Sequence, residues 1–156
     1  MYFDFYMSGS LIRMFHASKN DTHYRTTDFA SAEDKMKLFE DENGVIPDIV
    51  VYGDIHIQYM QKFYNKTIVN VGSVGNVVEF SNHDESIEDM SETIQAYYAI
   101  IEGEYGQKKK SSISIQFVRL PYDINKEIEI ATKNNSPSLE NYILELTTAT
   151  YRKNKK

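Results

Sequence analysis

The sequence contains no cysteine and no tryptophan, and its aromatic side chains are 12 tyrosines and 8 phenylalanines. The lack of cysteine excludes disulfide bonds, thiolate metal sites and a cysteine nucleophile, and it fits a reducing compartment. No apolar run reaches the roughly 18 residues that cross a bilayer. The first residues, 1–4, lack the basic start of a signal peptide. We therefore expect a cytoplasmic protein with no membrane partner.

Positive charge is scarce, since 17 Lys and Arg stand against 23 Asp and Glu, for a net charge of −6. An acidic chain is a poor partner for nucleic acid or anionic lipid, so we expect neither. The exception is the basic tail at 152–156, which is typical of a solvated terminus. The length of 156 residues suits one domain, which we place at 1–151.

Apolar periodicity and turn residues predict a mixed α/β fold that is sheet-rich in the middle and helical at the end. The polar segment 82–91 is expected to be a loop. Ser31 is the expected N-cap of the first helix, and Ser136 that of a last helix beginning at Pro137. The expected strands are 2–6, 10–15, 48–52, 55–63, 67–71, 95–102 and 111–120, and the first two helices are 31–42 and 123–134.

Two of the four histidines come directly after apolar strands. His16 follows the strand 10–15, and His56 follows the strand 48–52 together with Asp54. Side chains at the carboxyl ends of strands in an α/β sheet face a shared crevice, and imidazole and carboxylate groups bind Zn, Mn or Fe there. A strand-end histidine with a purely structural hydrogen bond is the alternative. His23 and His83 fall in polar segments and are expected to be loop residues.

The 29-residue run DIVVYGDIHIQYMQKFYNKTIVNVGSVGN, 48–76, resembles the calcineurin-like metallophosphoesterase superfamily in its YfcE-like phosphodiesterase branch. Gly53-Asp54-Ile55-His56 is similar to the family's Gly-His-x-His block. Asn70-Val71-Gly72-Ser73-Val74-Gly75 is similar to the turn that follows it. Upstream, Phe15-His16-Ala17-Ser18 resembles the block in which a histidine precedes a small residue. The segments 96–103 and 118–123 resemble the family's later strands in the same register.

The resemblance implies the C-terminal part of an α/β/β/α sandwich, with a mixed sheet and C-terminal helices. It implies a hydrolase that cleaves phosphodiesters or phosphomonoesters with divalent Mn, Fe, Zn or Ni, two ions in the complete family. His16 and Asp54 would serve the second ion and His56 the first. Asn70, Gly72 and Ser73 would lie close to the phosphate-ester substrate. Gly72 and Gly75 are each expected to need a positive φ in this turn.

The sequence departs from the family in ways that bear on activity. Asp54 stands where the family has a histidine, and Val71 replaces a proline. The family's first three metal-binding blocks have no counterpart before His16, so the resemblance covers the C-terminal half alone. We expect weak or no activity of the isolated chain, together with self-association or binding to a separate N-terminal half. The alternative is an inactive remnant or interaction module. A rearranged order of blocks, with Asp54-Ile55-His56 as the first, is less favoured.

Overall fold

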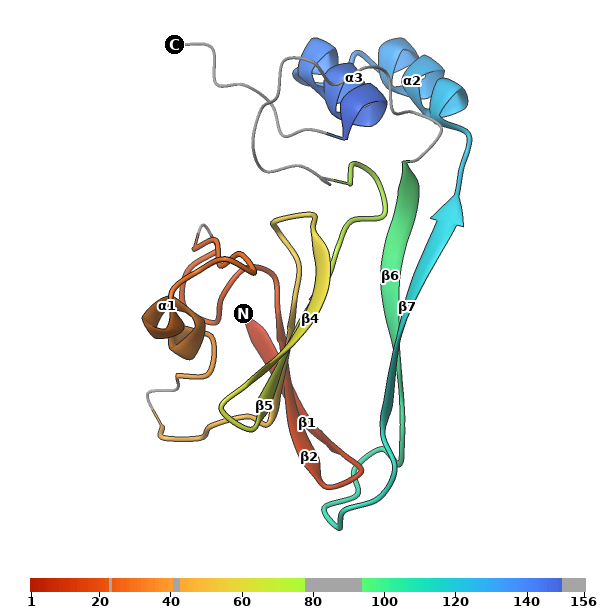
Figure 1. Cartoon of the computed structure of the whole chain (residues 1–156). Coiled ribbons are helices and arrows are strands. Elements are labelled where there is room, and N and C mark those ends of the chain that lie inside the picture. Colours follow the sequence, from red (N-terminus) through yellow and green to blue (C-terminus); the bar gives the residue numbers. More distant parts are fainter. Residues whose placement is uncertain (23, 41–42, 78–93, 150–156) are drawn as a thin grey trace.

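The structure is a computed structural model that describes the chain except for residues 23, 41–42, 78–93 and 150–156. Its strands and helices follow one another in the predicted order (Figure 1). The predictions for His23, His83, the segment 82–91 and the tail at 152–156 fall outside the described residues. The elements are β1 (Tyr2–Met7), β2 (Ser10–Phe15), α1 (Ala32–Lys37), β3 (Ile49–Tyr52), β4 (Gln58–Phe63), β5 (Lys66–Val71), β6 (Gln95–Glu102), β7 (Ser114–Pro121), α2 (Ile124–Lys133) and α3 (Leu139–Thr148).

Five strands form one mixed sheet in the order β1-β2-β3-β5-β4. The neighbours β2, β3 and β5 run parallel, while β1 and β4 pair antiparallel on the two edges. The short run Ile49–Tyr52 is buried along its whole length, as a central parallel strand requires. Tyr64 and Asn65 connect β4 and β5, and both have positive φ. This is the conformation of the two-residue hairpin turn that matches the twist of the paired strands.

A second, two-stranded sheet lies against the first. β6 and β7 pair antiparallel from Gln95 opposite Pro121 to Glu102 opposite Ser114. Their inward side chains, such as Ile101 and Phe117, pack on a buried cluster of Ile12, Ile49, Val51 and Val69 from the larger sheet. Figure 1 shows the long β6–β7 hairpin beside the larger sheet, with α2 and α3 at one end of it.

The other face of the five-stranded sheet is covered by α1 and its flanking loops. Leu38 and Phe39 pack there with Phe15, Val50 and Ile68. The Ser31 hydroxyl accepts a hydrogen bond from the amide of Asp34, as the predicted N-cap should. The helix is shorter than predicted and ends at Lys37, because the next turn brings Leu38 and Phe39 into the core.

The two C-terminal helices form a separate small core. Ile124 and Leu146 pack with Ile94 and Ala149, and Ile128 of α2 lies against them. Asp123 caps α2 by accepting from the amide of Lys126. The predicted start of α3 at Pro137 is wrong, because the helix begins at Leu139. Its N-cap is Ser138, whose left-handed conformation prevents the helix from starting earlier.

Arg13 is the largest fully buried side chain of the five-stranded sheet. Its guanidinium donates twice to the Asp4 carboxylate, at 2.8 Å from Nε and 2.7 Å from Nη2. It also reaches the carbonyls of Glu40 and Val45, which belong to the connection between α1 and β3. One buried cation thus joins the edge strand β1 to the segment that covers the sheet.

Replacing Asp4 with asparagine should therefore lower the free energy of unfolding by about 2–4 kcal/mol, because the buried guanidinium loses its counter-charge. Urea unfolding monitored by circular dichroism measures the change. Glu129→Gln, which neutralises an exposed carboxylate on α2, is the matched control and should change stability by less than about 0.5 kcal/mol. Equal stability of the two variants would contradict this role for Arg13.

Candidate functional site

Three parallel strands end at the same edge of the five-stranded sheet, and the predicted site residues follow them. His16 comes directly after β2, the segment 53–56 after β3, and the turn 70–75 at the end of β5. The Gly53 amide donates to the carbonyl of His16 at 2.8 Å, which joins the first two of these segments. The edge is therefore the place where α/β sheets bind ligands.

The structure brings His16 and Asp54 together. His16 Nε2 lies 3.2 Å from Asp54 Oδ1, and Arg25 Nε lies 3.3 Å from Asp54 Oδ2. The carboxylate is mostly buried, with 14% of the side chain exposed, whereas His16 and Arg25 are 66% and 54% exposed. Asp54 Oδ2 accepts no hydrogen bond from the described residues, so it is a buried oxygen with only the nearby guanidinium to balance it.

Arg25 lies in the polar loop before α1 and was not singled out by its sequence. The next residue, Thr26, is fully buried, and its carbonyl accepts a hydrogen bond of 2.6 Å from the Tyr52 hydroxyl. Burial raises the pKa of Tyr52 above its ordinary value, and burial also raises the pKa of its hydroxyl neighbour Tyr59 to about 12. Both phenols therefore stay neutral, and the end of β3 holds the loop that carries Arg25 in place.

His56 is oriented separately. Its Nδ1 lies 2.8 Å from the carbonyl of Asn76. Because a carbonyl can only accept, this contact needs a proton on Nδ1, and in the neutral ring Nε2 then carries the lone pair. This is the arrangement that a metal-binding histidine usually has, with a backbone carbonyl fixing the ring. Both Asp54 and His56 have positive φ, of 67° and 61°, a strained conformation that clusters at functional sites.

The donor geometry fits a divalent ion in part. Two ligands about 2.1 Å from a tetrahedral ion lie about 3.4 Å apart, close to the His16–Asp54 distance. His56 offers one further nitrogen. Across the described part of the chain, however, no three histidine, aspartate or glutamate side chains gather as one metal-binding group. His16 and Asp54 would hold one ion and His56 another, and their role as ligands stays a prediction.

The turn after β5 is built on Asn70. Its buried side chain donates to the Gly53 carbonyl at 2.7 Å and accepts from the Gly72 amide at 3.0 Å. The carbonyl of Ser73 accepts from the amide of Tyr97 on β6 at 2.8 Å. The turn thus ties the site edge to the second sheet. Gly72 has the expected positive φ of 79°, but Gly75 does not, so that expectation is wrong for Gly75.

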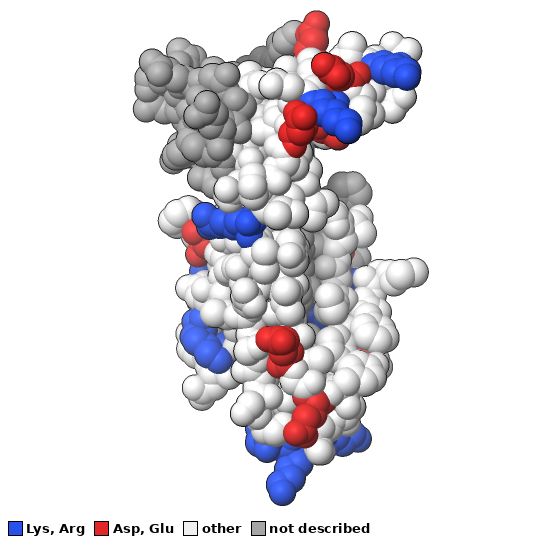
Figure 2. Space-filling model, turned by 90° about the vertical axis from the view of Figure 1, so that its right-hand side faces the viewer, with Lys and Arg blue, Asp and Glu red and all other residues white. Residues whose placement is uncertain are grey.

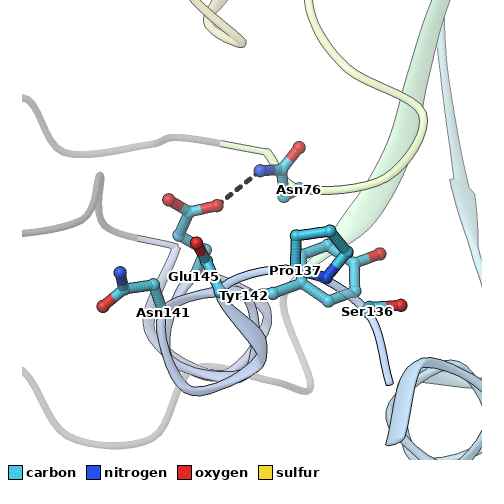
Figure 3. Close-up of a pocket in the computed structure, with 7 residues that line it drawn as sticks. Asn76, Ser136, Pro137, Asn141, Tyr142 and Glu145 are labelled. Atoms are coloured by element: carbon cyan, nitrogen blue, oxygen red, sulfur yellow. Dashed lines mark hydrogen bonds between the residues drawn. The ribbon is translucent and has the colours of Figure 1, made fainter. Parts of the chain in front are cut away.

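A polar cavity of about 340 Å³ adjoins this turn at Asn76 (Figure 3). The Asn76 amide donates to Glu145 Oε2 at 2.6 Å, and Glu145 is a buried carboxylate of α3. The backbone of Asn76 orients His56 while its side chain contacts α3, so α3 is coupled to the site. The sequence did not single out Asn76 or Glu145, since their link spans segments far apart in the chain. The lining residues are Asn76, Ser136, Pro137, Ser138, Asn141, Tyr142 and Glu145.

Gly72→Ala should lower the free energy of unfolding by about 2–4 kcal/mol, since a left-handed alanine is strained and overpacking adds to it. A Cβ at Gly72 would lie 2.8 Å from the Cβ of Tyr97. Gly75→Ala is the control within the same turn, because a Cβ there meets nothing within 4 Å. Thermal unfolding of both variants measures the difference, and equal midpoints would contradict the close packing at Gly72.

No family model matches the sequence, and no curated protein matches it significantly. Solved structures do. A hypothetical protein, PH1004 from Pyrococcus horikoshii OT3, superposes with a TM-score of 0.65 at 11% identity over 97% of this chain and 51% of that chain. A metallophosphoesterase from Sphaerobacter thermophilus superposes with a TM-score of 0.53 at 13% identity over 94% of this chain and 57% of that chain.

At these identities the likeness establishes the fold. The predicted fold class is confirmed: the chain is a mixed α/β structure with C-terminal helices, like that of the metallophosphoesterase. The chain spans about half the length of both similar structures. In the part of the chain that the structure describes, no helix is both long and apolar enough to cross a membrane.

Proposed function

We propose that the chain is the C-terminal half of a metal-dependent phosphoesterase of the YfcE-like branch, and that it hydrolyses phosphate esters efficiently only when the other half of the fold is present. The observation that carries this proposal is the strand-end edge. His16 and Asp54 place two donor atoms 3.2 Å apart there, and the contact of His56 Nδ1 with the Asn76 carbonyl leaves Nε2 as a further donor atom, on a fold shared with a metallophosphoesterase.

A bound divalent ion would polarise the phosphoryl group and lower the pKa of a water molecule toward neutrality. The residues of this chain would bind the ion and orient the groups around it. His16, Asp54 and His56 supply donor atoms, and the Asn76 carbonyl fixes the ring of His56. Asn70 holds the Gly72–Ser73 turn against the end of β3, where a phosphate ester would lie.

The face of β6 and β7 that points away from the larger sheet is the surface on which the partner would pack. Ile101, Ile115 and Phe117 face the larger sheet, so the alternate residues face outward. These outward residues include Tyr98 opposite Val118, with Ile100 and Leu120 beside them. Tyr98 and Ile100 are each 38% exposed and Leu120 55%. Figure 2 shows this side of the molecule, on which uncharged atoms cover most of the middle.

The same two strands have open edges. Within the described residues the sheet has two strands only, so β6 and β7 each keep one side without a neighbouring strand. A two-stranded sheet is marginal in water and gains stability from further strands or a covering helix. The half of the similar structures that this chain does not span would supply such elements. We therefore take the other half of the fold, in the same or a separate polypeptide, to cover this face.

A second function remains in view, an interaction module that keeps the fold without catalysis. The observation that favours it is the absence of a three-residue metal group among the described side chains. The DNA sequence upstream of the gene distinguishes the two proposals. Coding sequence upstream of Met1 for the metal-binding blocks that the family carries before His16, such as Asp-x-His and Gly-Asn-His-Asp, supports the enzyme, and its absence supports the module.

The isolated chain should hydrolyse an aryl phosphodiester slowly or not at all in the presence of Mn²⁺, because its donor atoms come from two incomplete ion sites. Release of the coloured aryl alcohol measures the rate. His56→Ala is the control that separates any true activity from contamination. Brisk hydrolysis by the wild-type chain that disappears in His56→Ala would contradict the need for another half.

The isolated chain should also self-associate as its concentration rises, since nothing else then covers the outward face of β6 and β7. Leu120→Glu should weaken this association by placing a charge on the face. Leu144→Glu is the matched control, an exposed leucine of α3 away from it. Sedimentation velocity measures the association. A wild-type chain that remains monomeric at high concentration would contradict an uncovered docking face.

A further inference from the structure

Arg25 has a position that the proposed function does not explain. Its guanidinium approaches the same carboxylate that a divalent ion would use, with Nε 3.3 Å from Asp54 Oδ2. The other carboxylate oxygen faces His16 Nε2 at 3.2 Å. Asp54 is thus shared between a potential ligand partner on one side and a fixed positive charge on the other.

The arrangement is built into the loop. Thr26, next to Arg25, is fully buried and is held through its carbonyl by the Tyr52 hydroxyl at the end of β3. Asp54 follows Tyr52 by two residues on the same connection, and its side chain is only 14% exposed. The carboxylate therefore has little freedom to turn into solvent, and both members of the pair are anchored to the end of one strand.

A divalent ion at His16 and Asp54 would lie beside a guanidinium. Like charges at such distances repel, and the repulsion is stronger near a partly buried carboxylate than in open water. Arginine keeps its charge at every physiological pH, so the repulsion is present throughout. Arg25 itself is 54% exposed, which leaves it room to move away when a stronger cation takes the carboxylate.

We propose that Arg25 is a built-in competitor for the Asp54 carboxylate, which lowers the affinity of the His16–Asp54 pair for a divalent cation. The ion pair takes the place of the metal while none is bound, and metal binding requires the guanidinium to withdraw. This inference rests on the proposed function only for the place where the ion binds. Its measurement needs no hydrolysis.

The test is Mn²⁺ binding to the full chain, followed by the loss of the free-ion signal in electron paramagnetic resonance. Arg25→Ala should bind Mn²⁺ about tenfold more tightly than the wild type, because the competing charge is gone. Arg25→Lys keeps a positive charge and should remain within about threefold of the wild type. Circular dichroism checks that each variant is folded, and Arg25→Gln replaces the alanine variant if that variant does not fold.

Two further variants locate the effect. Lys126→Ala removes one positive charge from an exposed position on α2 and should leave the affinity unchanged. Adding Asp54→Asn to Arg25→Ala should abolish the gain, because the carboxylate for which the two cations compete is then neutral. A gain that survives Asp54→Asn, or one that Arg25→Lys shows equally, would overturn the proposal.

Unchanged or weaker binding by Arg25→Ala would also overturn it, and would make the Arg25–Asp54 pair a purely structural contact. The outcome is separate from that of the proposed function. Tighter Mn²⁺ binding by Arg25→Ala would support competition by Arg25, even if the chain shows no phosphodiesterase activity when the other half of the fold is added. The lack of activity would reject the proposed enzyme. Activity with no gain in affinity would do the reverse.

Discussion

The parallel pairing of β2, β3 and β5 is the constraint on which the rest of the structure depends. Val50 and Val51 of β3 sit between Arg13 and Met14 on one side and Ile68 and Val69 on the other. Because these strands run in the same direction, the segments after β2 and β3 and the turn at the end of β5 meet at one edge. The candidate ligands His16, Asp54 and His56 and the turn 70–75 all belong to these segments, whereas Arg25 comes from the loop before α1 and Glu145 from α3.

Polar side chains and backbone groups fasten that edge. Asn70 bonds the turn after β5 to Gly53, the Gly53 amide bonds to His16, and the Tyr52 hydroxyl holds the loop of Arg25. The Asn76 carbonyl orients His56, and the Asn76 side chain reaches Glu145 on α3. Several hydrogen bonds therefore hold the backbone of the site, whereas the side chains of His16 and Arg25 are 66% and 54% exposed.

The two sheets differ in how their faces are covered. The larger sheet is covered on one face by α1 and on the other by β6 and β7, so its core is complete. The smaller sheet has one face packed and one face exposed, with Tyr98, Ile100 and Leu120 outward. The strands that carry the candidate ligands and the exposed face that we propose as a docking surface thus belong to different sheets, so a partner that covered this face would leave the site edge unchanged.

The sequence by itself determined the order of the elements, the apolar interior strands and the strand-end positions of His16, Asp54 and His56, because hydrophobic period and turn residues act locally. It also predicted the Ser31 cap and the positive φ of Gly72. The sequence misplaced the C-terminal end of α1, because packing of Leu38 and Phe39 overrides local preference. It also misplaced the start of α3, because Ser138 is left-handed. Only the tertiary structure decided that Arg25 shares Asp54 with His16 and that Asn76 links His56 to Glu145. Those contacts join residues 20 or more positions apart, and no local pattern records them.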